Sequence, residues 1–175
     1  MHNLPVVIDF SANHGVARIL TTKNDVIVVR INYRTGPLGF FGSKNLGIQD
    51  QINAINWIHN YIAYFGGDRN SLTVFGIGQS GFFADLVAQS SNIPKLGFQI
   101  KNIATIDGIA LSPWLTSVEY QRFLYRKTIE TIETFGFEEI DIRTLSLDEL
   151  SHIFSQVEQS LGPHRKVLNL SLLKI

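Results

Sequence analysis

The stretch Thr73-Val74-Phe75-Gly76-Ile77-Gly78-Gln79-Ser80-Gly81 leads from an apolar run through a glycine-rich turn into a helical pattern. Residues 72–75 are mostly apolar or β-branched, which predicts a strand, and residues 82–90 predict the helix that follows. Glycines between two such segments indicate a sharp change of chain direction. A strand, a tight turn and a helix in this order are typical of an α/β fold.

Three further segments extend the predicted sheet, namely residues 4–10 (LPVVIDF), 25–32 (DVIVVRIN) and 103–107 (IATID). Their apolar residues run almost continuously instead of alternating with polar ones, as in strands covered on both faces within a parallel sheet. We therefore predict an α/β fold with a mostly parallel sheet flanked by helices.

The predicted helices follow from apolar spacing and from capping residues. Isoleucines three or four residues apart predict a helix from Ile48 to Ile62, and the glycines after Phe65 are expected to end it. A charged helical pattern covers residues 119–135. Another helix is predicted to start at Ser146, where Ser146-Leu147-Asp148-Glu149 forms a capping box.

Composition excludes several classes of function. Of 175 residues, 45% are hydrophobic and 17% are charged, as in a globular chain with a core. Lys+Arg and Asp+Glu both number 15, so we predict no nucleic-acid binding. The chain has no cysteine, which excludes disulfides and thiolate chemistry. No histidine or acid spacing indicates a metal site, and neither a metal nor another cofactor is predicted.

No targeting or membrane segment is predicted. The first residues lack the basic and long apolar regions of a signal peptide. No apolar run approaches the roughly 20 residues that a membrane span needs. The compartment therefore cannot be assigned from the sequence.

The turn after residue 75 is compared with the G-x-S-x-G elbow, on which serine hydrolases of α/β architecture carry their nucleophile. With Gly76 as the first glycine, Gly78 stands where the serine belongs and Ser80 where the second glycine belongs. Glycine cannot attack a carbonyl because it has no side chain. Ser80 is an alternative nucleophile, but Phe82 would then occupy the second glycine position. The competing interpretation places Ser80 in the first helical turn.

Several longer segments carry a resemblance to a known family. They are residues 28–40 (VVRINYRTGPLGF), 45–51 (NLGIQDQ), 54–58 (AINWI), 60–68 (NYIAYFGGD), 73–76 (TVFG) and 110–114 (ALSPW). In these segments the chain resembles the type-B carboxylesterase and cholinesterase family of α/β-hydrolases. The resemblance implies a partial family domain over residues 4–154 that lacks the N-terminal and C-terminal parts, followed by a divergent tail at 155–175.

The resemblance also implies departures from the family's catalytic machinery. The family's His-Gly-Gly-Gly oxyanion loop is matched by Ser11-Ala12-Asn13-His14, whose side chains conflict with a loop built from backbone N–H groups. The family's acidic residue and histidine follow the serine along the chain, and no residue is matched to either. We therefore predict no catalytic residues and no significant esterase activity.

Family members without the serine indicate an alternative role. The resemblance includes adhesion proteins such as neuroligins and gliotactin-like proteins, some of which carry F-G-x-G as Phe75-Gly76-Ile77-Gly78 does. It implies an inactive, truncated family member that serves as a protein-interaction or adhesion module, with another protein as its partner. The alternative is a carboxylic ester hydrolase, either as a fragment of an active chain or through Ser80.

Individual side chains are given structural roles. Trp57 and Trp114 are predicted to anchor the core. Asp50 is expected in the opening turn of its helix and Asp68 in a capping position. Arg34 is expected to form an ion pair with an acid such as Asp50 or Asp68. His14 and His59 are expected to have structural or surface roles and not catalytic ones.

Overall fold

The computed structural model describes residues 3–11, 14–35, 39, 45–111, 126, 129–130, 133–134 and 145–160. The chain divides into two compact units, and each is described by itself. The first unit comprises Met1–Arg34 and Leu46–Ser112, and the second comprises Thr35–Asn45 and Pro113–Ile175.

The first unit is built on a four-stranded sheet in the order β2-β1-β3-β4. Its strands are β1 (Leu4–Asp9), β2 (Ile27–Arg30), β3 (Gly67–Ile77) and β4 (Asn102–Ile106). All three neighbouring pairs run parallel, which confirms the predicted parallel sheet. β3 is longer than predicted, because it begins at Gly67 instead of residue 72.

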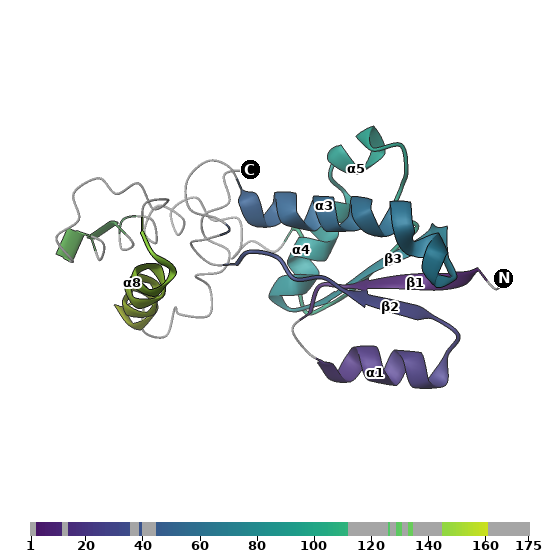
Figure 1. Ribbon diagram of the computed structural model, residues 1–175, viewed down its shortest axis with the longest axis horizontal. Helices are drawn as coiled ribbons and strands as arrows, with labels where there is room; N and C mark the ends of the chain where they lie inside the picture. Colours follow the sequence, from purple (N-terminus) through teal and green to yellow (C-terminus); the bar gives the residue numbers. More distant parts are fainter. Residues whose placement is uncertain are drawn as a thin grey trace. The chain divides into compact units, whose positions relative to one another are not determined.

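Helices cover both faces of this sheet, as Figure 1 shows for α1 (His14–Lys23) and α3 (Leu46–Tyr61), which lie on opposite sides. α3 contacts α4 (Gln79–Ala88), and α4 packs against β3 and β4. The two central strands hold fully buried residues, which include Val6 and Ile8 of β1 and Val74 of β3. Burial of these branched side chains on both sides of the sheet forms the core.

The helix α3 follows the predicted isoleucine spacing. Ile55, Ile58 and the following Ile62 are buried, and the last of these opens the short 3₁₀ helix η1 (Ile62–Phe65). Gly66 ends this run in the left-handed conformation (φ 84°), which confirms the predicted glycine cap. The prediction that Trp57 anchors the core was wrong, because its side chain is 52% exposed on the outer face of α3.

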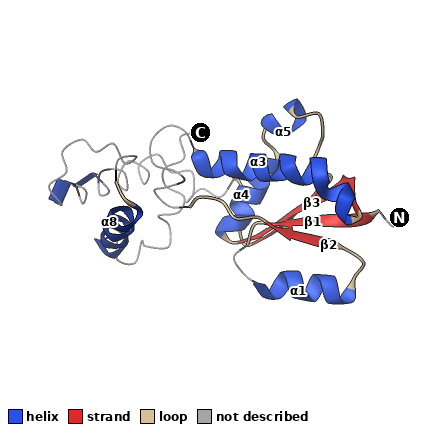
Figure 2. Cartoon of the chain, viewed as in Figure 1, coloured by secondary structure: helices blue, strands red, loops and turns tan. Residues whose placement is uncertain are grey.

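Two helices were not predicted, α1 and the short α5 (Asn92–Lys95), and Figure 2 shows both. In α1 the hydroxyls of Thr21 and Thr22 donate to backbone carbonyls three and four residues earlier. Such bonds satisfy a threonine inside a helix, although threonine has low helix propensity. Ile19 on the same helix is exposed, and no capping residue was predicted that would mark the start of α1.

The second unit contains α8 (Leu147–Ser160). Its start confirms the predicted capping box. The Ser146 N–H donates to Glu149 Oε2 (2.8 Å), and the Glu149 N–H donates to Ser146 Oγ (3.3 Å). The Ser146 hydroxyl also donates to Glu149 Oε2 (2.7 Å), and this bond, together with the one from the Ser146 N–H, lowers the pKa of the Glu149 carboxyl. Most of the helix predicted at 119–135 lies outside the described residues, as does Trp114.

The turn after β3 as a candidate functional site

Gly78 occupies the apex of the turn that joins β3 to α4. β3 ends at Ile77 and α4 begins at Gln79, so one residue reverses the chain. Its backbone has φ 59° and ψ −123°, and its N–H donates to the carbonyl of Ile106 in β4 (2.7 Å). Only glycine adopts such dihedrals without strain. The turn therefore has the sharp strand-to-helix geometry that a nucleophile elbow requires.

The space around the turn differs from one glycine to the next. A Cβ atom at Gly76 would overlap the backbone carbonyl of Ser80, and one at Gly81 would lie 2.9 Å from the Gly108 oxygen. A Cβ at Gly78 would meet no atom within 4 Å. The close approach of strand and helix thus excludes side chains at two positions, whereas the apex has room for one.

Ser80 lies in the first turn of α4, as one of the two interpretations predicted. Its hydroxyl donates to the Ile77 carbonyl and accepts from the Ile77 N–H, both at 2.9 Å. The Ser80 hydroxyl therefore links the first turn of α4 to the last residue of β3. Its only proton is already used in the hydrogen bond to the Ile77 carbonyl.

Residues 11–14, the segment predicted as the altered oxyanion loop, follow β1. β1 is paired with β3 in the sheet. The Phe10 N–H donates to the Phe75 carbonyl (2.9 Å), so both strands end at the same edge of the sheet. Ser11 is buried there. Ala12 and Asn13 lie outside the described residues, and so does the side chain of His14, the first residue of α1. Ligands of open α/β sheets bind beyond this carboxyl edge.

A buried ionic network that the sequence analysis missed supports this edge. The Asp9 carboxylate is 1% exposed and accepts from the Ser11 N–H (2.8 Å) and the Ser11 hydroxyl (2.6 Å). Its second oxygen pairs with Arg30 Nη2 of β2 (3.1 Å). Burial of a carboxylate is costly unless charge and hydrogen bonds compensate it. The acid inside the apolar run LPVVIDF was the available signal.

Tyr33 completes the surroundings of Asp9. Burial, with a smaller contribution from the Asp9 charge, raises the pKa of the Tyr33 phenol to about 12. Its ring packs between Phe10 (centroids 6.1 Å apart) and Phe83 of α4 (5.9 Å). The site is therefore joined to the helix after the turn through aromatic contacts.

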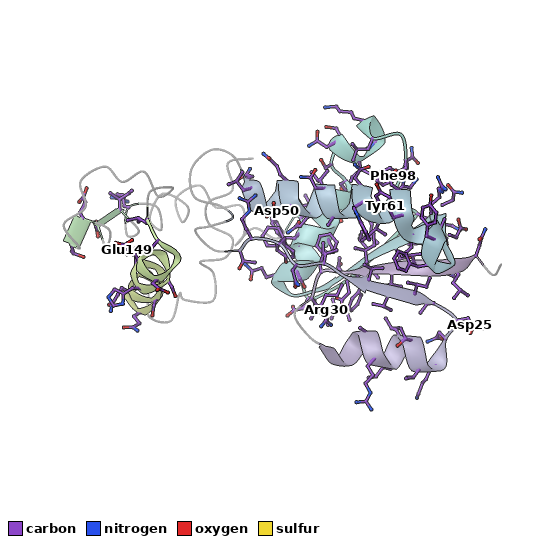
Figure 3. The ribbon with its side chains drawn as sticks, in the orientation of Figure 1. Asp25, Arg30, Asp50, Tyr61, Phe98 and Glu149 are labelled. Atoms are coloured by element: carbon purple, nitrogen blue, oxygen red, sulfur yellow. The ribbon has the colours of Figure 1, made fainter. Side chains whose placement is uncertain are left out.

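Other acids near the sheet also have structural partners. Asp50 accepts from Arg34 Nε and Nη2, both at 2.7 Å, and Figure 3 shows Asp50 on α3. These bonds lower the pKa of the Asp50 carboxyl. Because α3 starts at Leu46, Asp50 falls in the second turn, and the prediction of the opening turn was wrong. Asp68 accepts from the Asn70 N–H (2.9 Å), as expected of a local cap.

The His59 ring stacks on Phe98 (4.1 Å between centroids, 7° between planes), a packing contact far from the turn in sequence.

Among the side chains that the structure describes, no three His, Cys, Asp or Glu gather in a way that could hold a metal ion. Within the same residues, no helix has the length and apolarity that crossing a bilayer requires.

Comparison with known proteins agrees with this geometry. The family model described as the Carboxylesterase family matches residues 6–156. Neuroligin-3 from Homo sapiens is 40% identical over 158 residues, which cover 84% of this chain and 17% of that protein. Bile salt-activated lipase from Homo sapiens is 42% identical over 102 residues, or 55% of this chain and 13% of the lipase.

Solved structures show the same fold. A carboxylesterase from Geobacillus stearothermophilus superposes with a TM-score of 0.71 and 26% identity, covering 92% of this chain and 36% of that enzyme. The architecture is therefore that of the α/β-hydrolases. The chain spans less than a fifth of the length of the two human relatives. From the family match and this superposition, the chain belongs to the carboxylesterase family.

Proposed function

We propose that this chain is a catalytically inactive carboxylesterase-family domain that acts by binding another protein. The observation that carries the proposal is the apex of the turn after β3, where Gly78 offers no reactive atom. In serine hydrolases, removal of the nucleophile lowers turnover by about a millionfold. The segment at residues 11–14 also departs from a glycine-rich oxyanion loop, which reduces any remaining rate.

Ser80 does not replace the missing group in this proposal. Its hydroxyl is bonded twice to Ile77 within the turn, at 2.9 Å each. An activated serine instead donates its proton to a general base. Attack through Ser80 would require both bonds to break and the first turn of α4 to rearrange.

An exposed row of aromatic side chains supports the binding role. Trp57, Tyr61 and Tyr64 lie along α3 and η1, with ring centroids 5.2 Å and 6.5 Å apart in sequence order. They are 52%, 47% and 85% exposed. Aromatic residues are enriched at the centres of protein–protein interfaces, and exposed apolar clusters indicate such sites. We assign this aromatic row as the binding surface, consistent with the match to neuroligin-3.

The catalytic half of the proposal is tested with a fluorophosphonate probe, which labels only activated serines. We expect no labelling of the purified chain and no hydrolysis of a p-nitrophenyl ester above the buffer rate. Bile salt-activated lipase or another active hydrolase serves as the positive control. Labelling that is lost in Ser80→Ala would overturn the proposal and assign the nucleophile to Ser80.

The binding half is tested by coating beads with the purified chain and measuring saturable attachment to cells. Replacing Trp57 and Tyr64 by serine is expected to reduce attachment at least tenfold, because aromatic anchors contribute about 2 kcal/mol or more each at interface centres. Asn53→Ser, an exposed change on the same helix, is the matched control. Equal attachment by all three proteins would exclude the aromatic row. No saturable attachment by the wild type would count against the binding role itself.

A further inference from the structure

The pairing of β1 with β2 joins strands whose apolar residues are almost interchangeable. Residues 26–29, which include most of β2, are Val, Ile, Val and Val, and residues 6–8 of β1 are Val, Val and Ile. In the observed register the pairs are Val6 with Ile27, Val7 with Val28, Ile8 with Val29 and Asp9 with Arg30. Three of these four pairs therefore join one β-branched aliphatic side chain to another.

A slip of β2 by one residue would leave the apolar pairs almost unchanged. The residues opposite 6–8 of β1 would then be 26–28, again Val, Ile and Val. Such a slip also turns every side chain of the strand to the other face of the sheet, which is strongly opposed where one face is buried and the other is wet. All four residues of β2 are half-buried, so its two faces do not differ in this way. Apolar patterning alone therefore specifies the register weakly.

Of the four pairs, only that of Asp9 with Arg30 requires the observed register. Nη2 of Arg30, which is labelled in Figure 3, lies 3.1 Å from Asp9 Oδ2, and the Asp9 carboxylate is 1% exposed. After a slip of one residue, Val29 would lie opposite Asp9, and the Arg30 side chain would project from the other face of the sheet. The carboxylate would then lose its counter-charge, and a buried charge without compensation is strongly destabilising.

The Asp9 carboxylate is held in place by the chain that directly follows β1. Its Oδ1 accepts from the Ser11 N–H (2.8 Å) and from the Ser11 hydroxyl (2.6 Å), and neither bond involves β2. Oδ2 accepts from Arg30 of the neighbouring strand. Asp9 is therefore a fixed acceptor to which β2 must bring its arginine. The contact lies inside the sheet, so it does not depend on what covers the outer edges.

We propose that the Asp9–Arg30 pair fixes the register in which β2 joins the sheet, by excluding the slipped registers that the apolar residues would accept. A buried ion pair can often be replaced by packed apolar residues with little loss of stability, whereas a single buried polar contact can determine how two elements align. The proposal is independent of the proposed absence of catalysis and of the aromatic row.

The register of β2 in turn positions the residues that support the turn after β3. Just beyond β2, the Ile31 N–H donates to the Asp9 carbonyl (3.2 Å). Two residues later, the Tyr33 ring lies 5.9 Å from the Phe83 ring of α4. A slip of one residue would displace Tyr33 by about 3.3 Å along the strand direction and separate it from the helix that follows the turn. Asp9 and Arg30 are therefore positioning residues for this aromatic contact.

The test measures disulfide formation between β1 and β2, because the chain has no cysteine of its own that could interfere. Val7→Cys with Val28→Cys reports the observed register, since these residues are paired and neighbouring strands lie within disulfide range. Val7→Cys with Ile27→Cys reports a slip of one residue, because in the observed register these two side chains lie on opposite faces of the sheet. Each cysteine pair is introduced into the full chain, equilibrated in a redox buffer and quantified by mass spectrometry.

With Asp9 and Arg30 in place, we expect the disulfide of the observed register to exceed that of the slipped register about a hundredfold, as follows from the loss of a buried counter-charge. In the double variant Asp9→Asn with Arg30→Met, this ratio is expected to fall at least about tenfold. Asparagine keeps the oxygen to which both Ser11 donors bind, so the change removes the charge pair and leaves those bonds in place.

A matched control and a conservative variant make the test specific. Arg18→Met removes an exposed arginine from α1 and is expected to leave the ratio of the two disulfides unchanged. Arg30→Lys keeps the positive charge and is expected to keep the observed register dominant. Circular dichroism and a cooperative urea transition check that every variant is folded.

Three results would overturn the proposal. One is an unchanged ratio of the two disulfides in Asp9→Asn with Arg30→Met, which would show that packing alone sets the register. The second is an equal yield of both disulfides while Asp9 and Arg30 are still present. The third is loss of cooperative unfolding in the double variant, because the pair would then be required for stability and not for the choice between registers.

Discussion

At the scale of single residues, two glycines of the turn after β3 are required for different physical reasons. At Gly76 the reason is space, because a side chain there would overlap the Ser80 carbonyl. At Gly78 the reason is conformation, because φ is 59° while the surroundings are open. Spatial exclusion by backbone atoms cannot relax easily, whereas backbone strain has a limited cost.

Alanine substitutions distinguish the two reasons. Gly78→Ala is expected to lower the free energy of unfolding by about 1–3 kcal/mol, the usual cost of a side chain in a disfavoured backbone region. Gly76→Ala is expected to cost about 3 kcal/mol or more, since helix and strand must move apart. Gly97→Ala is the control, because Gly97 has φ 88° and open surroundings. Urea denaturation measures all three, and equal losses for Gly76 and Gly97 would contradict the steric explanation.

Tyr33 gives a prediction at alkaline pH. The pKa of its phenol is raised to about 12 in the folded chain, against 10.0 as the ordinary value. The folded state therefore holds the phenolic proton more tightly than the unfolded state does. The resulting contribution to the free energy of unfolding is present in full below pH 10 and is lost as pH rises towards 12. The loss amounts to about 2–3 kcal/mol.

Replacing Tyr33 by phenylalanine removes the titrating phenol, and with it the loss of stability at alkaline pH. Tyr33→Phe is expected to shift alkaline unfolding to higher pH, followed by circular dichroism. The exposed Tyr64→Phe is expected to leave the alkaline transition in place, because its phenol has no comparable burial. Identical transitions in the wild type and Tyr33→Phe would show that the phenol is not the titrating group.

At the scale of elements, one ion pair connects the segment after β2 to α3. Three donors of Arg34 reach the Asp50 carboxylate, namely the backbone N–H (3.1 Å), Nε and Nη2. The geometry is bidentate, yet Arg34 is about half exposed, so solvent screens much of the attraction.

Asp50→Asn is expected to lower the free energy of unfolding by about 1 kcal/mol at neutral pH. The pKa of the Asp50 carboxyl is lowered from 3.8, so its contribution is present above that value and is lost as pH falls through the folded pKa. The difference between wild type and variant should therefore disappear in acid. Asp25→Asn, on an exposed residue, is the control for general charge effects. A difference that persists at low pH would exclude this ion pair as its cause.

Elements with strong periodicity were predictable, and others were not. The isoleucine spacing located α3 to within two residues at its start. It did not show that Trp57 faces outward, because that depends on which neighbours cover the helix. α1 was missed because two adjacent threonines lower its helix propensity, and the bonds that satisfy their hydroxyls are visible only in the structure.

At the scale of the whole molecule, the α/β alternation and the parallel sheet followed from the sequence, because continuous apolar strands have few other packing solutions. The Asp9–Arg30 pair did not, because its members are 21 residues apart and meet only through the register of β1 on β2. The predicted limits of the family domain at residues 4–154 remain a prediction. The register of the turn was predictable from its motif, but its dihedral angles were not.

The dihedral angles of Gly78 bear on how such a chain changes over evolutionary time. Any residue with a Cβ atom is strained at this apex, so an ancestor carrying serine there would have stored that strain for the sake of chemistry. Exchange for glycine releases the strain without leaving a hole, since nothing packs against the position. Under the proposal made above, a return to a residue with a Cβ atom at this apex would lower the free energy of unfolding before it restored any rate. Backbone strain thus favours the exchange to glycine and opposes its reversal.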